Sequence, residues 1–227
     1  MVTVISLGGS IVAPEGVDEN FLKDFTAMIS ALLAQDEKRR FIFVVGGGGP
    51  ARSWQKAYRA VCPAPENEQA DWIGVMATRL NAQLIRAIMG EWCTQDVVID
   101  PTQVEPLMGR VLVAAGWKPG FSSDYDAVLL AERFNADAVI NLSNIEKVYT
   151  DDPKKNPEAK PVDNISWADF CSMVGDEWVP GKNLPFDPIA SRHAAKLGLK
   201  VICAAGRNLP NLKNILMNEA FIGTTIS

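Results

Sequence analysis

Short apolar runs alternate along the chain with longer stretches in which apolar residues recur every three or four positions. The runs are β-branched or aromatic and bounded by turn residues, as buried strands are, and they lie at residues 2–7, 41–45, 97–100, 111–114, 138–142, 200–204 and 223–226. Stretches with helical periodicity lie at residues 20–33, 69–89, 125–134, 165–174, 191–197 and 212–217. This order predicts an α/β protein, a three-layer α/β/α sandwich around a mainly parallel open sheet.

Capping residues and prolines fix the ends of two helices. Asp18 stands just before the helix at 20–33, where its carboxylate can accept from the first backbone N–H groups. Pro50 is placed as the first residue of a further helix. The Pro-Ala-Pro-Glu segment at 63–66 is expected to end that helix, because proline cannot continue it.

Two glycine tracts follow the first two predicted strands directly. Gly8, Gly9 and Ser10 follow the first strand, and residues 46–49 are four consecutive glycines after the second. A strand that ends in glycine and leads into a helix exposes backbone N–H groups that bind anions, most often phosphate. Since carboxyl ends of parallel strands meet at one edge of a sheet, we expect both tracts in a single cleft that handles more than one phosphate.

The second tract also matches the dinucleotide fingerprint G-x-G-x-x-A through Gly46, Gly48 and Ala51. That interpretation needs an acidic residue at the end of the next strand, about 20 positions further on. The acidic residues at 66–71 lie instead in a proline-broken stretch that leads into a helix, so a nicotinamide or flavin site is the less favoured alternative. The chain has no G-x-x-x-x-G-K-[ST] sequence, which excludes a P-loop.

Composition and charge narrow the class of protein. The chain has 227 residues, 48% hydrophobic and 22% charged, and a net charge of −5, as expected of a soluble globular protein that binds neither nucleic acid nor an anionic membrane. Without a leader-like segment or an apolar stretch of about 18 residues, a cytoplasmic location is expected. The four cysteines form no C-x-x-C pair and lie far from the single histidine, so we expect reduced thiols and no protein metal site.

Two groups of polar residues in the N-terminal half have both a structural and a functional interpretation. Arg52 lies in the first turn after the second glycine tract, where it either clamps a phosphate or is solvated. The helix at 69–89 has a face of small and polar residues, which suits close approach of a ligand or of another helix. The members of this face are Gly74, Ala77, Thr78 and Asn81.

Ser122, Ser123 and Asp124 precede the helix at 125–134. A serine there can cap the helix, and the carboxylate of Asp124 suits the positive end of the helix dipole. The functional alternative is that the serines bind phosphate while Asp124 orients a cationic group. The residues alone leave both interpretations open.

Together these motifs resemble those of the amino-acid-kinase superfamily over essentially the whole chain. The most specific are the helix motif Asp71-x-x-Gly-x-x-Ala-Thr-x-x-Asn81 and the segment Asn144-x-x-x-Val-Tyr-Thr-x-Asp-Pro-Lys154. The pattern is completed by both glycine tracts, by Ser-Ser-Asp at 122–124, by Asp-Pro-Ile-Ala at 187–190 and by the terminal Gly-Thr-Thr-Ile. Within the superfamily the chain is most similar to the uridylate kinases in their shorter archaeal form.

The resemblance implies a phosphotransferase that uses ATP with Mg²⁺ and phosphorylates UMP. It implies one domain over 1–227, with an acceptor-binding lobe at 1–115 and an ATP-binding lobe at 116–227, and self-association as a dimer or hexamer. The residues implied to face the acceptor are Gly47, Gly48, Arg52, Asp71, Thr78, Trp117, Ser122 and Ser123. Those implied to hold ATP are Gly8, Gly9, Ser10, Ser143, Asn144, Tyr149, Asp152 and Pro153.

Three positions depart from the family pattern. Ser6 stands where many members carry a lysine aimed at the transferring phosphoryl group, so Lys118 or Lys182, both in loops near the expected cleft, is the candidate for that charge. Trp117 replaces a threonine close to the pyrimidine, where an indole either stacks on the base or blocks it. Lys147 replaces a glycine beside the nucleotide site, where its ammonium either reaches the ATP phosphates or is solvated.

These departures keep two alternatives to UMP kinase activity open. One is the same fold acting on another small acceptor, a carboxylate, carbamate or phosphonate, which Trp117 favours. The other is a non-catalytic protein that binds a nucleotide or an oxyanion, which Ser6 favours. For the enzyme, the catalytic candidates are Asp124, Lys118 and Lys182. If the indole restricts the acceptor, Trp117→Thr is expected to raise activity with UMP.

Overall fold

The computed structural model of the chain describes residues 1–153, 155–175 and 184–227. Its strands are β1 (Val2–Leu7), β2 (Arg40–Val45), β3 (Val111–Ala114), β4 (Ala138–Ser143), β5 (Val148–Tyr149), β6 (Pro161–Val162), β7 (Asn164–Ile165), β8 (Val201–Ala205) and β9 (Thr224–Ile226). Its helices are α1 (Gly9–Val12), α2 (Glu19–Gln35), α3 (Gly48–Val61), α4 (Asn67–Met89), α5 (Ser123–Arg133), α6 (Trp167–Val174), α7 (Pro188–Leu197) and α8 (Leu209–Leu216), with a 3₁₀ turn η1 (Gly90–Trp92).

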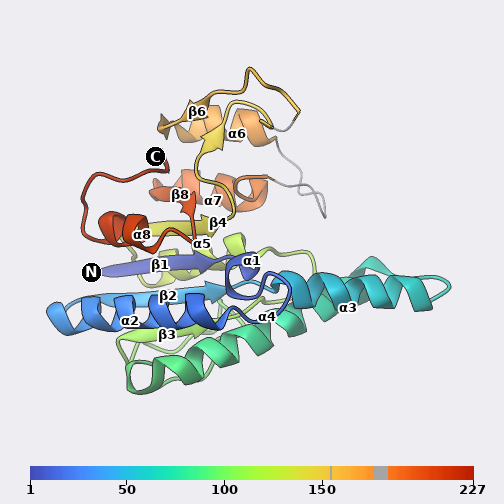
Figure 1. Ribbon diagram of the computed structural model, residues 1–227, viewed down its shortest axis with the longest axis horizontal. Coiled ribbons are helices and arrows are strands. Elements are labelled where there is room, and N and C mark those ends of the chain that lie inside the picture. The colour runs from blue at the N-terminus through green and yellow to red at the C-terminus, as the bar shows by residue number, and fades with distance from the viewer. Residues whose placement is uncertain (154, 176–183) are drawn as a thin grey trace.

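Most of the strands form one sheet in the order β3-β2-β1-β4-β8-β9-β7, while β5 and β6 form a separate hairpin (Figure 1). Strands β3, β2, β1, β4 and β8 run parallel to one another. Strand β9 is antiparallel to β8 and parallel to β7. The predicted mainly parallel open sheet is confirmed.

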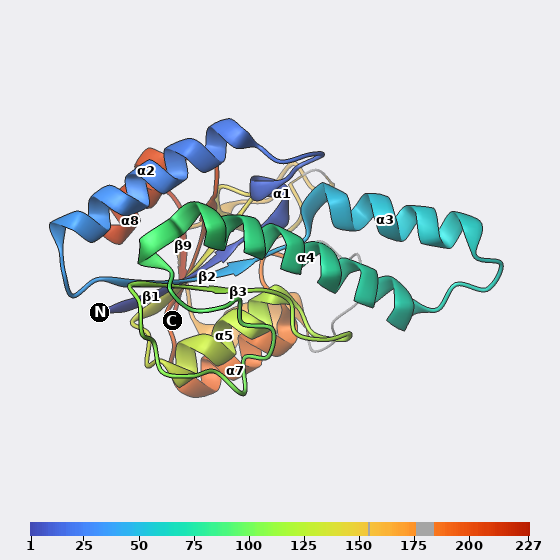
Figure 2. The ribbon, with the colours of Figure 1, turned by 90° about the horizontal axis from the view of Figure 1, so that it is seen from below.

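Helices cover both faces of this sheet, because successive strand residues point into two different apolar cores. Ile5 and Phe43 pack with α2, α4 and α8 in one core. Val4 and Ile42 pack with α5, α6 and α7 in the other. Figure 2 shows α2, α4 and α8 on one side of the strands and α5 and α7 on the opposite side. The predicted three-layer sandwich is therefore confirmed.

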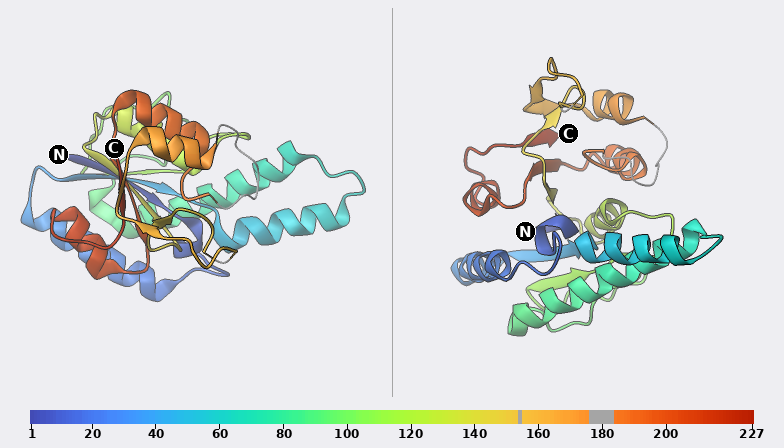
Figure 3. Two further views of the ribbon diagram at one scale, coloured as in Figure 1. Left: turned by 90° about the horizontal axis from the view of Figure 1, so that it is seen from above. Right: turned by 45° about the vertical axis from the view of Figure 1, so that its right-hand side comes forward.

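Helices α3 and α4 form a hairpin that extends beyond the end of the sheet (Figures 2 and 3). The proline-rich segment 63–66 lies between them, so α3 ends where the sequence predicts. Large apolar side chains remain exposed on this hairpin: Trp54 is 69%, Met76 57% and Leu80 71% exposed. The projecting hairpin therefore presents several large apolar side chains to solvent.

The capping predictions are confirmed, and the start of α3 corrects another prediction. Asp18 caps α2 by accepting from the Phe21 N–H at 3.0 Å. Helix α3 begins at Gly48 with Gly47 as its N-cap, so Pro50 is the third residue of the helix rather than the first. The fold tolerates proline there because the first N–H groups of a helix have no partner within it. No helix in the described ranges is long and apolar enough to cross a membrane.

The strand predicted at 97–100 is wrong. Val98 makes a single parallel bridge to Ala114 at the β3 edge of the sheet, and no strand forms around it. The reason lies at Asp100, whose carboxylate accepts from both the N–H (2.9 Å) and the hydroxyl (2.6 Å) of Thr102 and closes a turn. This turn carries the chain away from β3 before a second bridge can form.

Candidate active site

The two glycine tracts lie side by side at the carboxyl edge of the sheet. Strands β1 and β2 are parallel neighbours with Leu7 and Val45 in register, so the tracts leave the sheet together. Their backbones touch, since a Cβ atom on Gly9 would lie 2.0 Å from the Gly48 nitrogen and one on Gly46 would lie 2.4 Å from the Gly9 nitrogen. Only residues without a side chain permit this approach.

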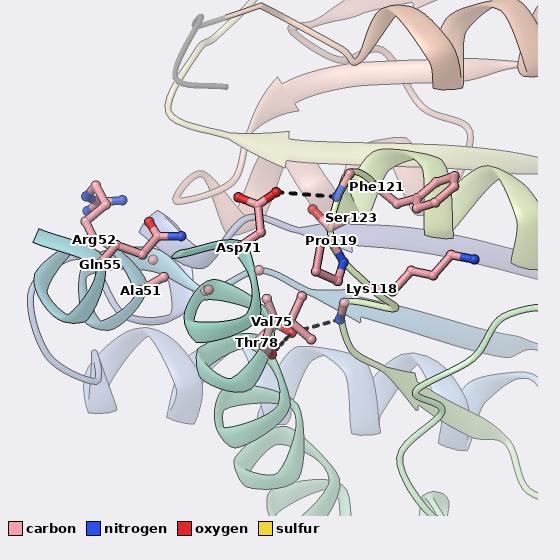
Figure 4. A pocket seen from close by; sticks show the side chains of 16 residues that line it. Ala51, Arg52, Gln55, Asp71, Val75, Thr78, Lys118, Pro119, Phe121 and Ser123 are labelled. Carbon is pink, nitrogen blue, oxygen red and sulfur yellow. Dashed lines mark hydrogen bonds between the residues drawn. The ribbon is translucent and has the colours of Figure 1, made fainter. Parts of the chain in front are cut away.

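A cavity of about 300 Å³ opens beside the second tract (Figure 4). Its walls come from the start of α3, one face of α4 and the loop between β3 and α5. Most residues predicted to face the acceptor line it: Gly47, Gly48, Arg52, Asp71, Thr78 and Ser123. Lys118, predicted as a source of positive charge, lines it as well. The fold thus gathers, in one hollow, residues from distant parts of the sequence.

Helix α4 ties the cavity loop to the sheet edge. The Thr78 hydroxyl donates to the Val75 carbonyl (2.6 Å) and accepts from the Gly116 N–H (2.8 Å). Two turns earlier on α4, the Asp71 carboxylate accepts from the Gly120 N–H at 3.4 Å, as the dashed line in Figure 4 shows. Both ends of the loop are therefore held by side chains that also line the cavity.

Asn81 and Arg52 support the floor and the rim of the cavity. Asn81, on α4 and only 3% exposed, donates its Nδ2 hydrogens to the carbonyls of Gly46 (2.9 Å) and Gly47 (3.2 Å). Arg52 is exposed at the rim and donates to the Pro14 carbonyl at 2.9 Å. The amide of Asn81 fixes these two carbonyls, while the N–H groups of Gly46 and Gly49 donate to the carbonyls of Leu7 (3.0 Å) and Ala13 (2.8 Å). Among the described residues of the tract, this leaves the N–H groups of Gly47 and Gly48, which line the cavity, for a ligand.

The small and polar face of α4 serves both purposes that the sequence left open. A Cβ atom on Gly74 would lie 2.7 Å from the Gln55 Nε2, so Gly74 allows α3 to approach. Gly74 and Thr78 also line the cavity. The same face of α4 therefore packs against α3 and lines the cavity.

Asp124 stands at the start of α5, close to β1. Its two carboxylate oxygens accept from the Ser6 hydroxyl (3.2 Å) and the Asp187 N–H (3.2 Å). Burial raises the pKa of Asp124 to about 7, and the Asp187 carboxylate adds to the rise. Ser6 offers this carboxylate a hydroxyl and no positive charge, whereas many members of the resembled family carry a lysine at that position.

Of the two candidate cations, Lys182 lies outside the described residues. The Lys118 ammonium lies 3.8 Å from the Trp117 ring centroid and 5.2 Å from that of Phe121. Figure 4 shows the Lys118 side chain directed away from Asp71 and Thr78. In this conformation its charge rests on aromatic faces rather than in the cavity.

Trp117 and Ser122, both predicted to face the acceptor, are not among the cavity-lining residues. The Trp117 ring packs on Phe121 with centroids 4.8 Å apart. Thr102 and, less strongly, the Trp117 indole lower the pKa of Asp100, so the indole lies near that carboxylate. The Ser122 hydroxyl caps α5 by accepting from the Tyr125 N–H at 3.2 Å, which is the structural of its two interpretations.

The first five residues predicted to hold ATP, three of them along its phosphates, lie at the junction of β1 and β4. The Gly8 N–H donates to the Leu142 carbonyl at 3.0 Å, which holds the first tract against the end of β4. Gly9 and Ser10 continue into α1. Ser143 ends β4 and accepts at its hydroxyl from the Ile145 N–H at 3.3 Å, with Asn144 exposed between them.

The remaining residues predicted on the ATP side follow in the β5–β6 hairpin. Tyr149 pairs with Pro161 across that hairpin. The turn after it contains residues 152–153, and the Asp152 carbonyl accepts from the Lys155 N–H at 2.9 Å. Lys147 forms an ion pair with Asp163, so its ammonium is engaged in the protein rather than simply solvated.

Three residues not singled out from the sequence support the cavity. Gln55 lines it and donates to the Ala70 carbonyl at 2.8 Å. Arg79, on α4, donates to the Trp117 carbonyl at 3.0 Å. Asp126 is completely buried on α5 beneath the same loop. In the sequence an acidic residue near a helix start suggests only a dipole contact, and nothing signals burial.

Comparison with known proteins identifies the family and the fold. Residues 1–205 match the model of the Amino acid kinase family. The chain is 33% identical to a uridylate kinase of Methanospirillum hungatei, covering 99% of this chain and 94% of that protein. It is 32% identical to one of Thermoplasma volcanium, covering 98% and 96%. The structure is similar to uridylate kinase from Archaeoglobus fulgidus, with a TM-score of 0.84, 30% identity and 100% of both chains covered. UMP kinase from Bacillus anthracis, 20% identical with a TM-score of 0.79, shares the fold.

Proposed function

Because the chain belongs to the amino acid kinase family, we propose that it transfers the γ-phosphoryl group of ATP to the phosphate of UMP, giving UDP and ADP. The observation that carries the proposal is the contact between the two glycine tracts. The second tract lies beside the acceptor cavity, and the first, which follows β1, is held against the end of β4. Relatives covering nearly the whole chain are named uridylate kinase, which supports UMP as the acceptor.

On the acceptor side, the UMP phosphate would rest on the N–H groups of Gly47 and Gly48 at the start of α3, since the Gly49 N–H donates to the Ala13 carbonyl and Pro50 has no N–H. The 14-residue helix adds the positive end of its dipole, and the Arg52 guanidinium stands at the rim. The Asp71 carboxylate and Thr78 hydroxyl supply polar contacts for the nucleoside. Since the acceptor phosphate is already an anion, the reaction needs no general base.

On the donor side, Gly8, Gly9 and Ser10 would follow the ATP phosphates, and the adenine and ribose would lie against residues 143–144, 149 and 152–153. The 1–115 half would then supply most of the acceptor site, and the 116–227 half the contacts to the adenine and ribose of ATP, with Gly8, Gly9 and Ser10 of the first half along the ATP phosphates. Mg²⁺ would enter as part of the Mg–ATP substrate and spread the charge of its phosphates. Among the described residues, no group of three or more acidic, cysteine or histidine side chains is arranged to hold a metal ion.

Catalysis in this reaction consists of positioning and of stabilising the charge on the transferring group. Asp124 would orient a cation there, with Ser6 and Asp187 fixing its carboxylate. Lys118 is our candidate among the described residues, and rotation about its side-chain bonds would carry the ammonium from Trp117 toward the cavity that it lines. Lys182 stays the other candidate.

The experiment that tests the function measures ADP release in a coupled assay with UMP, CMP, carbamate and acetylglutamate. We expect turnover to be highest with UMP. Turnover with carbamate or acetylglutamate alone would replace UMP by a non-nucleotide acceptor. ATP binding without turnover of any acceptor would overturn the enzymatic function.

We also propose that the chain self-associates through the α3–α4 hairpin and acts in the cytoplasm, where its nucleotide substrates are available. An apolar groove of about 500 Å³ on this hairpin is lined by Trp54, Trp72, Met76 and Leu80, and a second copy of the same face would cover it. Leu80→Glu is expected to lower the mass measured by light scattering, whereas Lys23→Glu on α2 leaves it unchanged. A monomeric wild type would contradict the proposal.

A further inference from the structure

Asp126 is a buried carboxylate that the proposed reaction does not use. It is 0% exposed, and its Oδ2 accepts from the Trp117 N–H at 3.2 Å. Its Oδ1 is buried and has no hydrogen-bond partner in the described part of the chain. Burying a carboxylate with half of its acceptors unsatisfied costs free energy. A hydrophobic residue would remove that cost, so the contact with Trp117 is what the carboxylate contributes.

Trp117 belongs to the loop that forms one wall of the acceptor cavity, and the loop is gripped from two helices. From α4, Arg79 donates to the Trp117 carbonyl at 3.0 Å and Thr78 accepts from Gly116 at 2.8 Å. From α5, Asp126 accepts from the Trp117 N–H. The peptide groups on both sides of Trp117 are thus held from opposite directions, which fixes the orientation of the loop at this residue.

The orientation of Trp117 determines the position of the Lys118 ammonium. The Lys118 ammonium lies over the Trp117 ring, and Lys118 and Pro119 line the cavity directly after it. A turn of the Trp117 peptide would move the ring, the ammonium and this wall together. The carboxylate of Asp126 does not line the cavity, so it can affect the cavity only by holding this loop.

We propose that Asp126 is a positioning residue for the acceptor site: by holding the Trp117 N–H, it keeps the loop from Gly116 to Gly120 in the position in which Lys118 and Pro119 close the cavity. The proposal rests on the proposed function for its substrate, UMP. The ordering of the loop by Asp126 can be tested whether or not the protein turns over UMP.

Two replacements separate positioning from packing. Asp126→Asn retains an oxygen that can accept from the Trp117 N–H, whereas Asp126→Val does not. For Asp126→Val we expect amide hydrogen exchange at 116–120 to rise about tenfold and the KM for UMP to rise about tenfold, the effect of one lost hydrogen bond, with kcat changed less than about threefold. At pH 6, where Asp126 is largely protonated and neutral like an amide, both quantities stay close to the wild type for Asp126→Asn. Asp137→Val, which removes a carboxylate that accepts from Val2 far from the cavity, is the matched control and leaves both unchanged.

A pH profile adds a readout that does not require the valine variant to fold. Burial, with Asp124 and Asp100 adding, raises the pKa of Asp126 to about 7. These two carboxylates and the Arg79 guanidinium, which bonds to the same residue of the loop, are the charges near it. Ionised Asp126 accepts more strongly than the protonated acid. The ratio of the KM of Asp126→Asn to that of the wild type should therefore rise severalfold from pH 6 to pH 8, while titration of UMP itself cancels in the ratio.

The outcomes divide cleanly. Faster exchange and a higher KM in Asp126→Val but not in Asp126→Asn, together with a rising ratio, support the proposal. Equal effects of both replacements, unchanged exchange and KM in a folded Asp126→Val, or a flat ratio overturn it. Wild-type protein without UMP turnover would refute the proposed function instead, and amide exchange would still test the loop.

Discussion

Replacing Gly9 by alanine tests the contact between the two glycine tracts most directly. The added Cβ would lie 2.0 Å from the Gly48 nitrogen and 2.6 Å from atoms of Gly46 and Gly47, against 3.4 Å or more in an ordinary contact. The backbones would have to separate by the difference, 3.4 − 2.0 = 1.4 Å. Two hydrogen bonds oppose this movement: the Gly8 N–H donates to the Leu142 carbonyl at 3.0 Å, and the Gly46 N–H donates to the Leu7 carbonyl at 3.0 Å.

The expected cost follows from these contacts. Losing one or two such hydrogen bonds at about 1 kcal/mol each, with about 1–3 kcal/mol of overpacking, lowers the free energy of unfolding by about 2–5 kcal/mol. A misplacement of about 1 Å between donor and acceptor lowers kcat by about 10²-fold. Urea unfolding and the coupled ADP assay measure the two effects.

Gly16→Ala is the matched control for this experiment. A Cβ atom on Gly16 would meet nothing within 4 Å, so stability and kcat should stay at wild-type values. If Gly9→Ala were as stable and as active as Gly16→Ala, the two tracts could not be in contact in solution, and the reasoning about donor and acceptor would fail with it.

Three further predictions concern the surroundings of the site. Asn81→Leu removes the side-chain hydrogen bonds to the carbonyls of Gly46 and Gly47, of which the second still accepts from the Ala51 N–H, so we expect a loss of about 1–3 kcal/mol in urea unfolding and a KM that rises for UMP more than for ATP; equal rises would contradict it. Asp124 and Asp126 hold their protons more tightly in the folded chain, with pKa values of about 7 against an ordinary aspartate value of 3.8. The unfolded chain releases these protons first, so the free energy of unfolding should fall from pH 5 to pH 8 by about 2–3 kcal/mol per group, and Asp126→Asn should reduce that slope; an unchanged slope would count against a buried, protonated Asp126. Trp117→Thr removes a ring that does not line the cavity, so the ratio of activities with UMP and CMP should stay the same; a changed ratio would place the indole beside the base.

Much of the fold could be predicted from the sequence, because the buried strands and amphipathic helices carry strong local periodicity. Each element that was predicted wrongly depends on one particular contact. The strand expected at 97–100 fails through a turn closed by Asp100. The start of α3 moves two residues because the Gly47 carbonyl already accepts from the Ala51 N–H at 3.3 Å. Short elements such as α1 and the β5–β6 hairpin have too few residues to show a period.

The candidate site was predictable where a motif lies within one element, and not where separate elements meet. The second glycine tract and the face of α4 meet around the cavity, as the resemblance implies. Trp117 and Ser122 take other positions because the first packs on Phe121 and the second caps α5. The grip of Arg79 and Asp126 on the cavity loop joins elements that no local pattern connects, so only the folded chain shows it.

Strand β1 lies between β2 and β4, and this position has a consequence for how the chain can vary. The span from the acceptor tract to the end of β4 is two strand spacings, roughly 10 Å, and backbone hydrogen bonds set it. Side chains within these strands contribute to the cores, but they do not change that spacing. The separation between the proposed acceptor site and the proposed adenine and ribose site is thus set by the backbone, and core substitutions can raise or lower stability while leaving that separation intact.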